Sequence, residues 1–118
     1  MNHASDPNCL FCRVVAKEVP STTVREDDDT YAFRDIDPRA PTHVLVVPKR
    51  HIPSVDDLGP DDADVIARLV LAAQEVAARE GLNGGYRLVV NTGGDAGQSV
   101  SHLHVHVLGG RSFAWPPG

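Results

Sequence analysis

Three histidines alternate with aliphatic residues near the carboxyl end of the chain, where Ser101 to Gly110 reads SHLHVHVLGG. Side chains of a β-strand alternate between its two faces. The spacing therefore predicts a strand with His102, His104 and His106 on one face and aliphatic side chains on the other. Neighbouring imidazoles on such a face would stand roughly 7 Å apart. This separation favours a row of independent polar groups over a single metal ion bound by all three.

Phosphoryl chemistry suits such a row of imidazoles. A neutral imidazole can attack phosphorus and form a covalent intermediate that water later breaks. Neighbouring imidazoles, whose unperturbed pKa is about 6.5, can donate hydrogen bonds to phosphoryl oxygens and transfer protons at neutral pH. Surface histidines on a solvated sheet face are the alternative interpretation. The aliphatic opposite face and the adjoining glycine-rich loop favour phosphoryl or nucleotidyl transfer without a catalytic metal.

The glycine-rich loop runs from Thr92 to Ser101 and reads TGGDAGQSVS. Its glycines would let backbone amides approach an anion closely, and Ser99 adds a hydroxyl that can donate to an oxyanion or a leaving atom. Alone, the loop is more typical of a hairpin that needs positive φ angles. Its place immediately before the histidines favours anion binding.

Length and charge narrow the class of protein. The 118 residues predict one domain with a modest core, and a hydrophobic fraction of 42% is typical of a globular protein. The formal net charge of −5 disfavours a nucleic-acid partner, although local amides and imidazoles can hold a small phosphorylated ligand. Because no apolar run is as long as a membrane span and Met1 to Asn8 has no signal-sequence core, we expect a cytoplasmic protein without a membrane partner.

The elements that must position the histidines can be predicted from periodicity and turn residues. We expect residues 1–8 to form a flexible tail and residues 9–118 to form the domain. Pro20 would end a short first helix, and a long helix would begin after Gly59-Pro60 and end before Gly81. The predicted helices span Cys9–Glu18 and Asp61–Glu80, and the predicted strands span Thr22–Arg25, Thr30–Asp35, His43–Pro48, Tyr86–Asn91 and His102–Leu108.

The long helix carries an apolar stripe that would pack on the sheet. Its members are Val65, Ile66, Leu69, Val70, Ala73, Val76 and Ala77. Because only one long helix accompanies five closely linked strands, a regular alternation of strands and helices is excluded. The expected fold is α+β, with a five-stranded, mainly antiparallel sheet.

The motif from His102 to Leu108, HLHVHVL, matches the histidine-triad pattern His-φ-His-φ-His-φ-φ, in which φ is an apolar residue. On this motif and its flanking matches, the chain resembles the Hint branch of the histidine triad (HIT) superfamily. The resemblance extends from Leu10 to the terminal Trp-Pro-Pro-Gly. Its further matches are Asp35-Ile36, Ala40-Pro41-Thr42-His43, Val47-Pro48-Lys49, Gly85-Tyr86-Arg87, Asn91 and Gly97-Gln98-Ser99.

The resemblance implies a HIT-like homodimer whose two five-stranded sheets join into one, with a purine-nucleotide pocket on each subunit. It also implies hydrolysis of nucleoside 5′-phosphoramidates, such as an amine joined to AMP, and of aminoacyl adenylates. At the third triad position, the related nucleotidyltransferases have glutamine. This chain has His106 there, and in this it resembles the hydrolases of the superfamily. The diadenosine-polyphosphate hydrolase branch is the nearer alternative, but the Trp-Pro-Pro-Gly end and the short chain resemble Hint.

Residue roles follow from the same resemblance, position by position. His104 resembles the nucleophile that takes the nucleotidyl group. His106, Ser99 and His43 resemble the groups around the phosphate and the leaving amine. Asp35 resembles the carboxylate that holds the ribose hydroxyls, for which its two acceptor oxygens are suited. Asn91, Gly97 and Gln98 are implied as further substrate contacts, and the base pocket is implied at Leu10, Phe11, Val14, Phe33, Arg34 and Ile36.

The cysteines of the sequence CLFC, Cys9 and Cys12, have several interpretations. No strand precedes them as in a thioredoxin-like redox site, and a disulfide is disfavoured in a reducing cytoplasm. With two histidines they could complete a tetrahedral zinc site, the alternative being two buried thiols. The arrangement resembles that of some bacterial Hint-like proteins, which implies structural zinc on Cys9, Cys12, His51 and His102. Four protein ligands leave no open position for substrate, so this zinc would not be catalytic.

Two further function classes compete with the phosphoramidate hydrolase. A zinc-dependent hydrolase could use the three histidines as metal ligands, but no carboxylate stands beside them at strand or helix spacing. A nucleotide-binding regulatory module could keep the fold with little turnover, but the intact His104 and Ser99 disfavour it.

Overall fold

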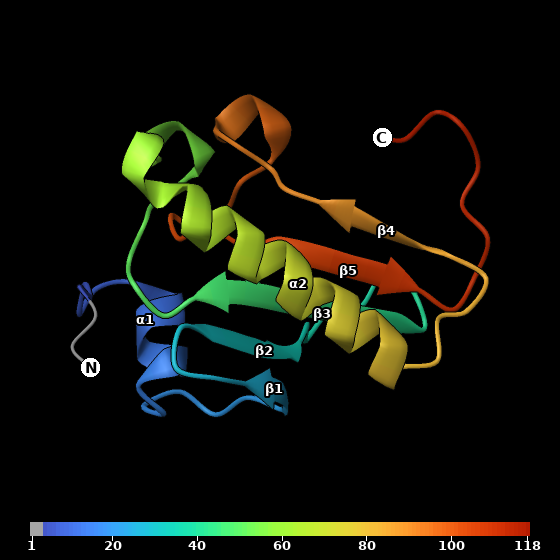
Figure 1. The fold of residues 1–118 in the computed structure, drawn as a ribbon, viewed down its shortest axis with the longest axis horizontal. Coiled ribbons are helices and arrows are strands. Elements are labelled where there is room, and N and C mark those ends of the chain that lie inside the picture. The colour runs from blue at the N-terminus through green and yellow to red at the C-terminus, as the bar shows by residue number, and fades with distance from the viewer. Residues whose placement is uncertain (1–3) are drawn as a thin grey trace.

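Residues 4–118 are described by the structure, a computed structural model. Their five strands form one antiparallel sheet in the order β1-β2-β3-β5-β4 (Figure 1). The strands are β1 (Thr23–Glu26), β2 (Thr30–Arg34), β3 (Thr42–Pro48), β4 (Tyr86–Val89) and β5 (Val105–Gly109). With one long helix beside them, they confirm the predicted α+β fold. In this order β5 lies between β3 and β4, so the histidine-bearing segment leads into an inner strand.

The long helix α2 (Ala63–Arg79) crosses one face of the sheet (Figure 1). A 3-10 turn over Pro60–Asp62 precedes it, so the α-helix begins at Ala63 rather than at Asp61. Its buried residues are Leu69, Ala72, Ala73, Val76 and Ala77. In the described part of the chain, no helix has the length and apolar character needed to cross a membrane.

The predicted apolar stripe of α2 is wrong at two positions. Ile66 and Val70 are 38% and 47% exposed. Each residue of an α-helix is rotated by about 100° from the one before it, so Val70 points to the side of the helix when Leu69 points into the core. Ala72, which the stripe omits, takes a buried place instead.

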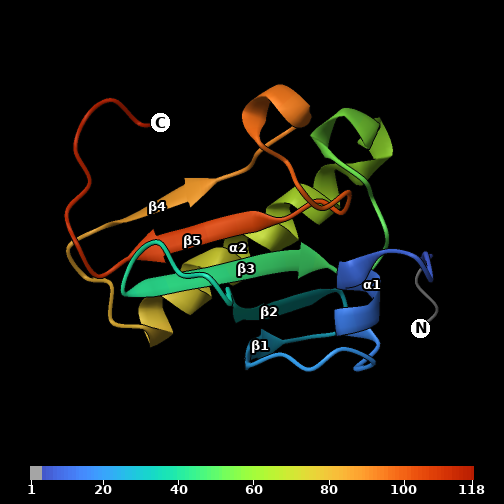
Figure 2. The same ribbon diagram turned by 180° about the vertical axis from the view of Figure 1, so that it is seen from behind.

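The short helix α1 (Leu10–Val15) packs on the opposite face, beside the carboxyl end of β3 (Figure 2). The sequence predicts a longer helix, ending at Glu18. The helix stops earlier because Lys17 has a φ of 65°, a left-handed conformation that ends a helix. A second apolar cluster joins α1 to the sheet and contains Cys9, Phe11, Cys12, Val14, Tyr31, Phe33, Leu45 and Val47.

The three histidines do not all lie in one regular strand. His102 and His104 precede β5, and only His106 lies within it. The predicted alternation still holds, because the rings of His102 and His104 contact Phe11 of α1. The residues between and after them that are buried in the core under α2 are Leu103, Val105 and Val107. The ring centroids of His104 and His106 are 5.0 Å apart, closer than a regular strand predicts, because the rings meet edge to face.

The predicted flexible tail is only partly outside the described residues. Residues 1–3 are not described, whereas residues 4–8 are bonded to the domain. The N–H of His51 donates to the carbonyl of Ala4 at 2.7 Å, and the N–H of Cys9 donates to the carbonyl of Asp6 at 3.0 Å. The described start of the chain is therefore part of the structure that holds α1 against the loop after β3.

Candidate functional site

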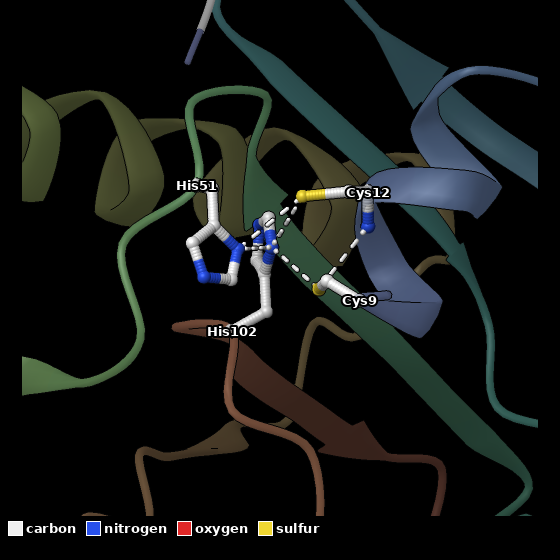
Figure 3. Close-up of side chains that lie close together, drawn as sticks. All are labelled: Cys9, Cys12, His51 and His102. Atoms are coloured by element: carbon white, nitrogen blue, oxygen red, sulfur yellow. Dashed lines mark hydrogen bonds between the residues drawn. The ribbon is translucent and has the colours of Figure 1, made fainter. Parts of the chain in front are cut away.

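Four metal-ligating side chains converge beside α1 (Figure 3). Cys9 and Cys12 come from α1 and its N-cap, His51 from the loop after β3, and His102 from the segment before β5. Nδ1 of His102 lies 3.4 Å from Sγ of Cys9 and 3.5 Å from Sγ of Cys12. Nδ1 of His51 lies 3.3 Å from Sγ of Cys12 and 3.3 Å from Nδ1 of His102. All four ligand atoms lie within 4.8 Å of one another, so these residues could bind a metal ion.

The spacing of these atoms fits a tetrahedral site. With bonds of about 2.0 Å to nitrogen and about 2.3 Å to sulfur, the edges of a tetrahedron are about 3.3–3.8 Å long. The separations of 3.3, 3.4 and 3.5 Å lie within that range.

The protonation of His102 also suits metal binding. Its Nε2 lies 2.8 Å from the carbonyl oxygen of Pro48. Because a carbonyl only accepts, Nε2 carries the ring proton and Nδ1 presents a lone pair to the cysteines and His51. Burial lowers the pKa of His102 to about 4, so its ring stays neutral at neutral pH. Burial also raises the pKa of Cys12 to about 11, so a thiolate there needs a cation beside it.

His104 is held so that one ring nitrogen is free. Its Nδ1 lies 2.7 Å from the carbonyl oxygen of His102 and therefore carries the proton. Within residues 4–118, Nε2 of His104 has no hydrogen-bond partner. Because no unpaired side-chain nitrogen or oxygen of these residues is fully buried, Nε2 is accessible from outside the protein. Nε2 consequently presents an open lone pair, as a nucleophile must. The edge of Phe11, 5.2 Å away between ring centroids, holds the plane of the ring.

His43 and His106 form a hydrogen-bonded pair beside His104. His43 in β3 faces Leu108 in the β-ladder, so its side chain reaches diagonally to His106 on the same face. Nε2 of His43 lies 2.9 Å from Nδ1 of His106, and the main-chain N–H of Arg39 donates to Nδ1 of His43 at 3.0 Å. Burial lowers the pKa of both histidines, that of His106 to about 4.

Asp35 closes this second cluster. One of its carboxylate oxygens, Oδ2, lies 3.4 Å from Nε2 of His43, and the other, Oδ1, accepts from the N–H of Asp37 at 2.8 Å. The side chain is partly exposed, so it can also meet a ligand. Asp35, His43 and His106 are close enough to hold a metal ion as well.

The residues expected in the base pocket do not all lie together. Phe11, Val14 and Phe33 are buried in the cluster under α1, and Leu10 is exposed beside them. Ile36 is 99% exposed in the loop after β2. Arg34 is different, because its guanidinium forms two hydrogen bonds to Glu80 at the end of α2. Strand alternation places its side chain on the α2 face, away from the histidines, so it does not line a pocket beside them.

The side chain of Gln98 stabilises the glycine-rich loop to which it belongs. Gly93 and Gly97 have φ angles of 83° and 85°, so the loop needs glycine at these turns. The side chain of Gln98 accepts from the N–H of Gly93 at 2.9 Å and donates to the carbonyls of Pro53 and Val100. Both polar atoms of the Gln98 side chain are therefore bonded inside the protein, which makes this side chain a support of the loop. Asn91 at the start of the loop is half-buried, whereas Gly97 and Ser99 are exposed.

Two hollows in the described part of the chain differ in the residues that line them. One of about 380 Å³ is lined by Ser99, Leu10 and the metal-ligating Cys9 and His51, among others. The other, of about 790 Å³, lies between the α2–β4 turn and the residues after β5, and its wall contains no histidine, cysteine or carboxylate. The smaller hollow adjoins two of the candidate metal ligands, whereas the polar side chains of the larger one are those of Asn83, Tyr86, Arg87, Arg111 and Ser112.

Several site groups were beyond sequence reasoning because they belong to the main chain. The N–H of Arg39 and the carbonyl of Pro48 each bond a site histidine, and no residue type signals them. Phe11 does have a signal, since its place in the first helix marks it as buried, but its edge contacts with the histidine rings follow only from the packing.

Comparisons with known proteins agree with this geometry. Residues 16–113 match the family model described as HIT domain. The chain belongs to the HIT family. It is 46% identical over 109 residues to an uncharacterized HIT-like protein of Synechocystis sp., a match that covers 92% of this chain and 96% of that protein.

Solved structures of HIT family members share the whole fold. A HIT family hydrolase from Legionella pneumophila is 49% identical, with a TM-score of 0.92, and the match covers 94% of this chain and all of that one. A HIT family hydrolase from Clostridium thermocellum is 42% identical with a TM-score of 0.91, covering 93% of this chain and 96% of that one. The HIT fold is therefore present over almost the full length of the chain.

Proposed function

We propose that this HIT protein is a hydrolase that cleaves nucleoside 5′-phosphoramidates, such as an amine joined to AMP, and aminoacyl adenylates, through a nucleotidyl-histidine on His104. The carrying observation is the open Nε2 of His104, whose lone pair is fixed by the bond from Nδ1 to the carbonyl of His102. The hydrolase names of the two structural relatives support the general activity. Nucleotide binding, which is general in the HIT family, supports the substrate class.

The reaction has two steps that balance at phosphorus. Nε2 of His104 attacks phosphorus, the P–N bond to the amine breaks, and the amine leaves with the proton of the Ser99 hydroxyl; in an aminoacyl adenylate the P–O bond breaks instead and the carboxylate leaves. Water then attacks the same phosphorus, the bond to Nε2 breaks, one proton of the water replaces the one that Ser99 gave to the amine, and the nucleoside monophosphate is released. In this scheme His106, His43 and the exposed Ser99 surround the phosphate and the leaving amine. Asp35 holds the ribose through its partly exposed carboxylate.

The base site in this proposal is narrower than the sequence implies. It consists of Leu10, Phe11, Val14, Phe33 and Ile36, where apolar side chains and one loop residue can enclose a flat purine. Arg34 is left out because its side chain binds Glu80 on the other face. Asn91 and the exposed Gly97 remain proposed contacts, with the N–H of Gly97 already donating to the carbonyl of Gly94 at 3.0 Å, and Gln98 supports the loop that carries them.

We also propose that the Cys9, Cys12, His51 and His102 site holds zinc. Two sulfur and two nitrogen donors at tetrahedral spacing are the ligand set that zinc prefers, and they fill its coordination shell. Bound there, zinc would supply no chemistry to the substrate. It would tie α1, the loop after β3 and the segment before β5 together, so its binding energy would stabilise the fold.

A homodimer is the proposed assembly. β4 is the last strand of the sheet and leaves a free edge, on which Tyr86 and Leu88 are exposed. Pairing of this edge with its copy would continue the sheet across two subunits, as the resemblance to Hint implies. A solution mass of twice that of one chain would support this assembly, and a monomeric mass would contradict it.

Turnover of an AMP amide, measured before and after treatment with a chelator, separates the function classes. Continued turnover at low temperature after loss of metal supports the proposed hydrolase. Loss of all turnover that added zinc restores indicates a metal-dependent hydrolase. Nucleotide binding without turnover in either sample indicates a regulatory module, and faster cleavage of diadenosine polyphosphates than of AMP amides indicates the diadenosine-polyphosphate branch.

A further inference from the structure

The loop between β2 and β3 aims one main-chain N–H at the active-site histidines. Arg39 lies between Pro38 and Pro41, which restrict the backbone on both sides. Its N–H donates to Nδ1 of His43 at 3.0 Å, while its side chain points away and bonds Asp37. The contact that reaches the site therefore does not depend on the side chain at this position.

A main-chain N–H can only donate, so this bond settles the protonation of His43. Nδ1 of His43 must be the acceptor and cannot carry a proton. The proton of a neutral His43 is then on Nε2, which lies 2.9 Å from Nδ1 of His106 and 3.4 Å from Oδ2 of Asp35. The shorter contact is the hydrogen bond, so Nδ1 of His106 is in turn an acceptor. A neutral His106 therefore has its proton on Nε2.

We infer that the main-chain N–H of Arg39 is a positioning group that sets the tautomers of His43 and His106, and so makes neutral His106 a hydrogen-bond donor at Nε2. Within residues 4–118 this Nε2 has no partner, so the N–H points to open space beside His104. A neutral N–H donor suits a phosphoryl oxygen, whose charge it can bind without taking up a proton. The tautomers follow from the hydrogen bonds alone, whereas the phosphate beside Nε2 rests on the function proposed above.

The same bonds explain why Asp35, His43 and His106 act as a hydrogen-bonded row rather than as a metal site. A metal on Nε2 of His43 would require the ring proton on Nδ1, where it would face the N–H of Arg39. His102 has the opposite arrangement, because its Nε2–H donates to a carbonyl and its Nδ1 is free to bind a metal. One main-chain group therefore sets the role of each cluster. The N–H of Arg39 makes the His43 cluster a hydrogen-bonded row, and the carbonyl of Pro48 leaves Nδ1 of His102 free to bind a metal.

Nitrogen NMR of the histidine rings tests the tautomers in the wild-type protein, without any substrate. The expected result is a proton on Nε2 and none on Nδ1 for both His43 and His106. A proton on Nδ1 of either ring overturns the inference. This result is independent of turnover, so a protein that proved inactive on AMP amides would still confirm or refute the tautomers.

A pair of variants at position 39 tests the origin of the tautomers. Arg39→Pro removes the N–H, and Arg39→Ala keeps it while removing the side chain. We expect mixed tautomers of His43 in Arg39→Pro and wild-type tautomers in Arg39→Ala. Unchanged tautomers in a folded Arg39→Pro protein would show that another group sets them. If Arg39→Pro does not fold, the wild-type spectrum still decides whether the tautomers are as inferred.

Binding of AMP tests the donor role of His106. Gln places an amide N–H close to the position of Nε2, and it is neutral at all pH values, so His106→Gln should keep most of the AMP affinity. His106→Ala should lose affinity by about tenfold, the value of one hydrogen bond to a charged group. If the glutamine variant loses as much as the alanine variant, a neutral donor at this position is not what binds the phosphate.

Discussion

The partly buried His106 makes the stability of the protein depend on pH in a calculable way. Burial lowers its pKa from 6.5 to about 4 in the folded chain. The unfolded chain therefore binds the proton first as the pH falls, and the folded state loses stability from about pH 6.5 down to about pH 4. Between about pH 7.5 and about pH 5, this one group should reduce the free energy of unfolding by about 2 kcal/mol.

Urea denaturation of wild type and of His106→Gln at the two pH values measures this effect. Glutamine does not titrate, so the acid-induced loss of stability should be smaller in the variant by about 2 kcal/mol. Acid effects on groups that do not contact His106, the candidate metal ligands included, are common to both proteins and cancel in the difference. Asp56→Asn, at an exposed carboxylate, is the matched control and should leave the acid-induced loss nearly unchanged. Equal losses in wild type and His106→Gln would refute the reasoning that the folded protein keeps His106 in its neutral form.

Three other predictions concern the metal, the ribose and the packing of the site. Cys12→Ser should lose zinc and melt at a lower temperature, yet keep hydrolysis at low temperature that added zinc does not raise. Elemental analysis of the wild-type protein should find about one zinc per chain, and the absence of zinc would contradict the site. Asp35→Ala should weaken discrimination for ribose, and equal wild-type turnover of ribose and dideoxyribose substrates would show that no such discrimination exists. Phe11→Ala should lower the free energy of unfolding by about 3–5 kcal/mol, because Phe11 is buried against Phe33 and His104, and Phe11→Leu should lose much less in the same urea titration.

The histidine face could be predicted from sequence because alternation is a local property of an extended chain. Leu103 and Val107 are buried under α2 while His102 and His104 contact α1, as the spacing requires. That prediction survives even though β5 begins only at Val105, because an extended segment alternates whether or not it is bonded into the sheet.

The resemblance predicts which positions lie near the site better than it predicts which way each side chain points. Arg34 stands next to residues of the expected base pocket in sequence, but alternation along β2 puts it on the α2 face with Ala32, where Glu80 binds it. The signal was available in the strand pattern, since Tyr31 and Phe33 are the residues of β2 in the cluster with α1. The exposure of Val70 has a similar origin, in a rotation of about 100° from its buried neighbour.

Main-chain partners could not be predicted from residue types. The N–H of Arg39 and the carbonyl of Pro48 decide which ring nitrogens of His43 and His102 carry protons. Every residue of the chain has a carbonyl and all but the prolines have an N–H, so only the folded loops show which of them meet the histidines.

Trapping of the covalent intermediate tests the central claim most directly. Wild-type protein is mixed with an AMP amide, quenched within the first turnovers, and digested for peptide mass spectrometry. The account predicts an adenylyl group on Nε2 of His104, and none in His104→Ala, which should still bind AMP because Asp35 and the apolar pocket remain. An adduct of normal yield in His104→Ala, or one found on another residue of the wild type, would contradict the assignment of His104 as the nucleophile.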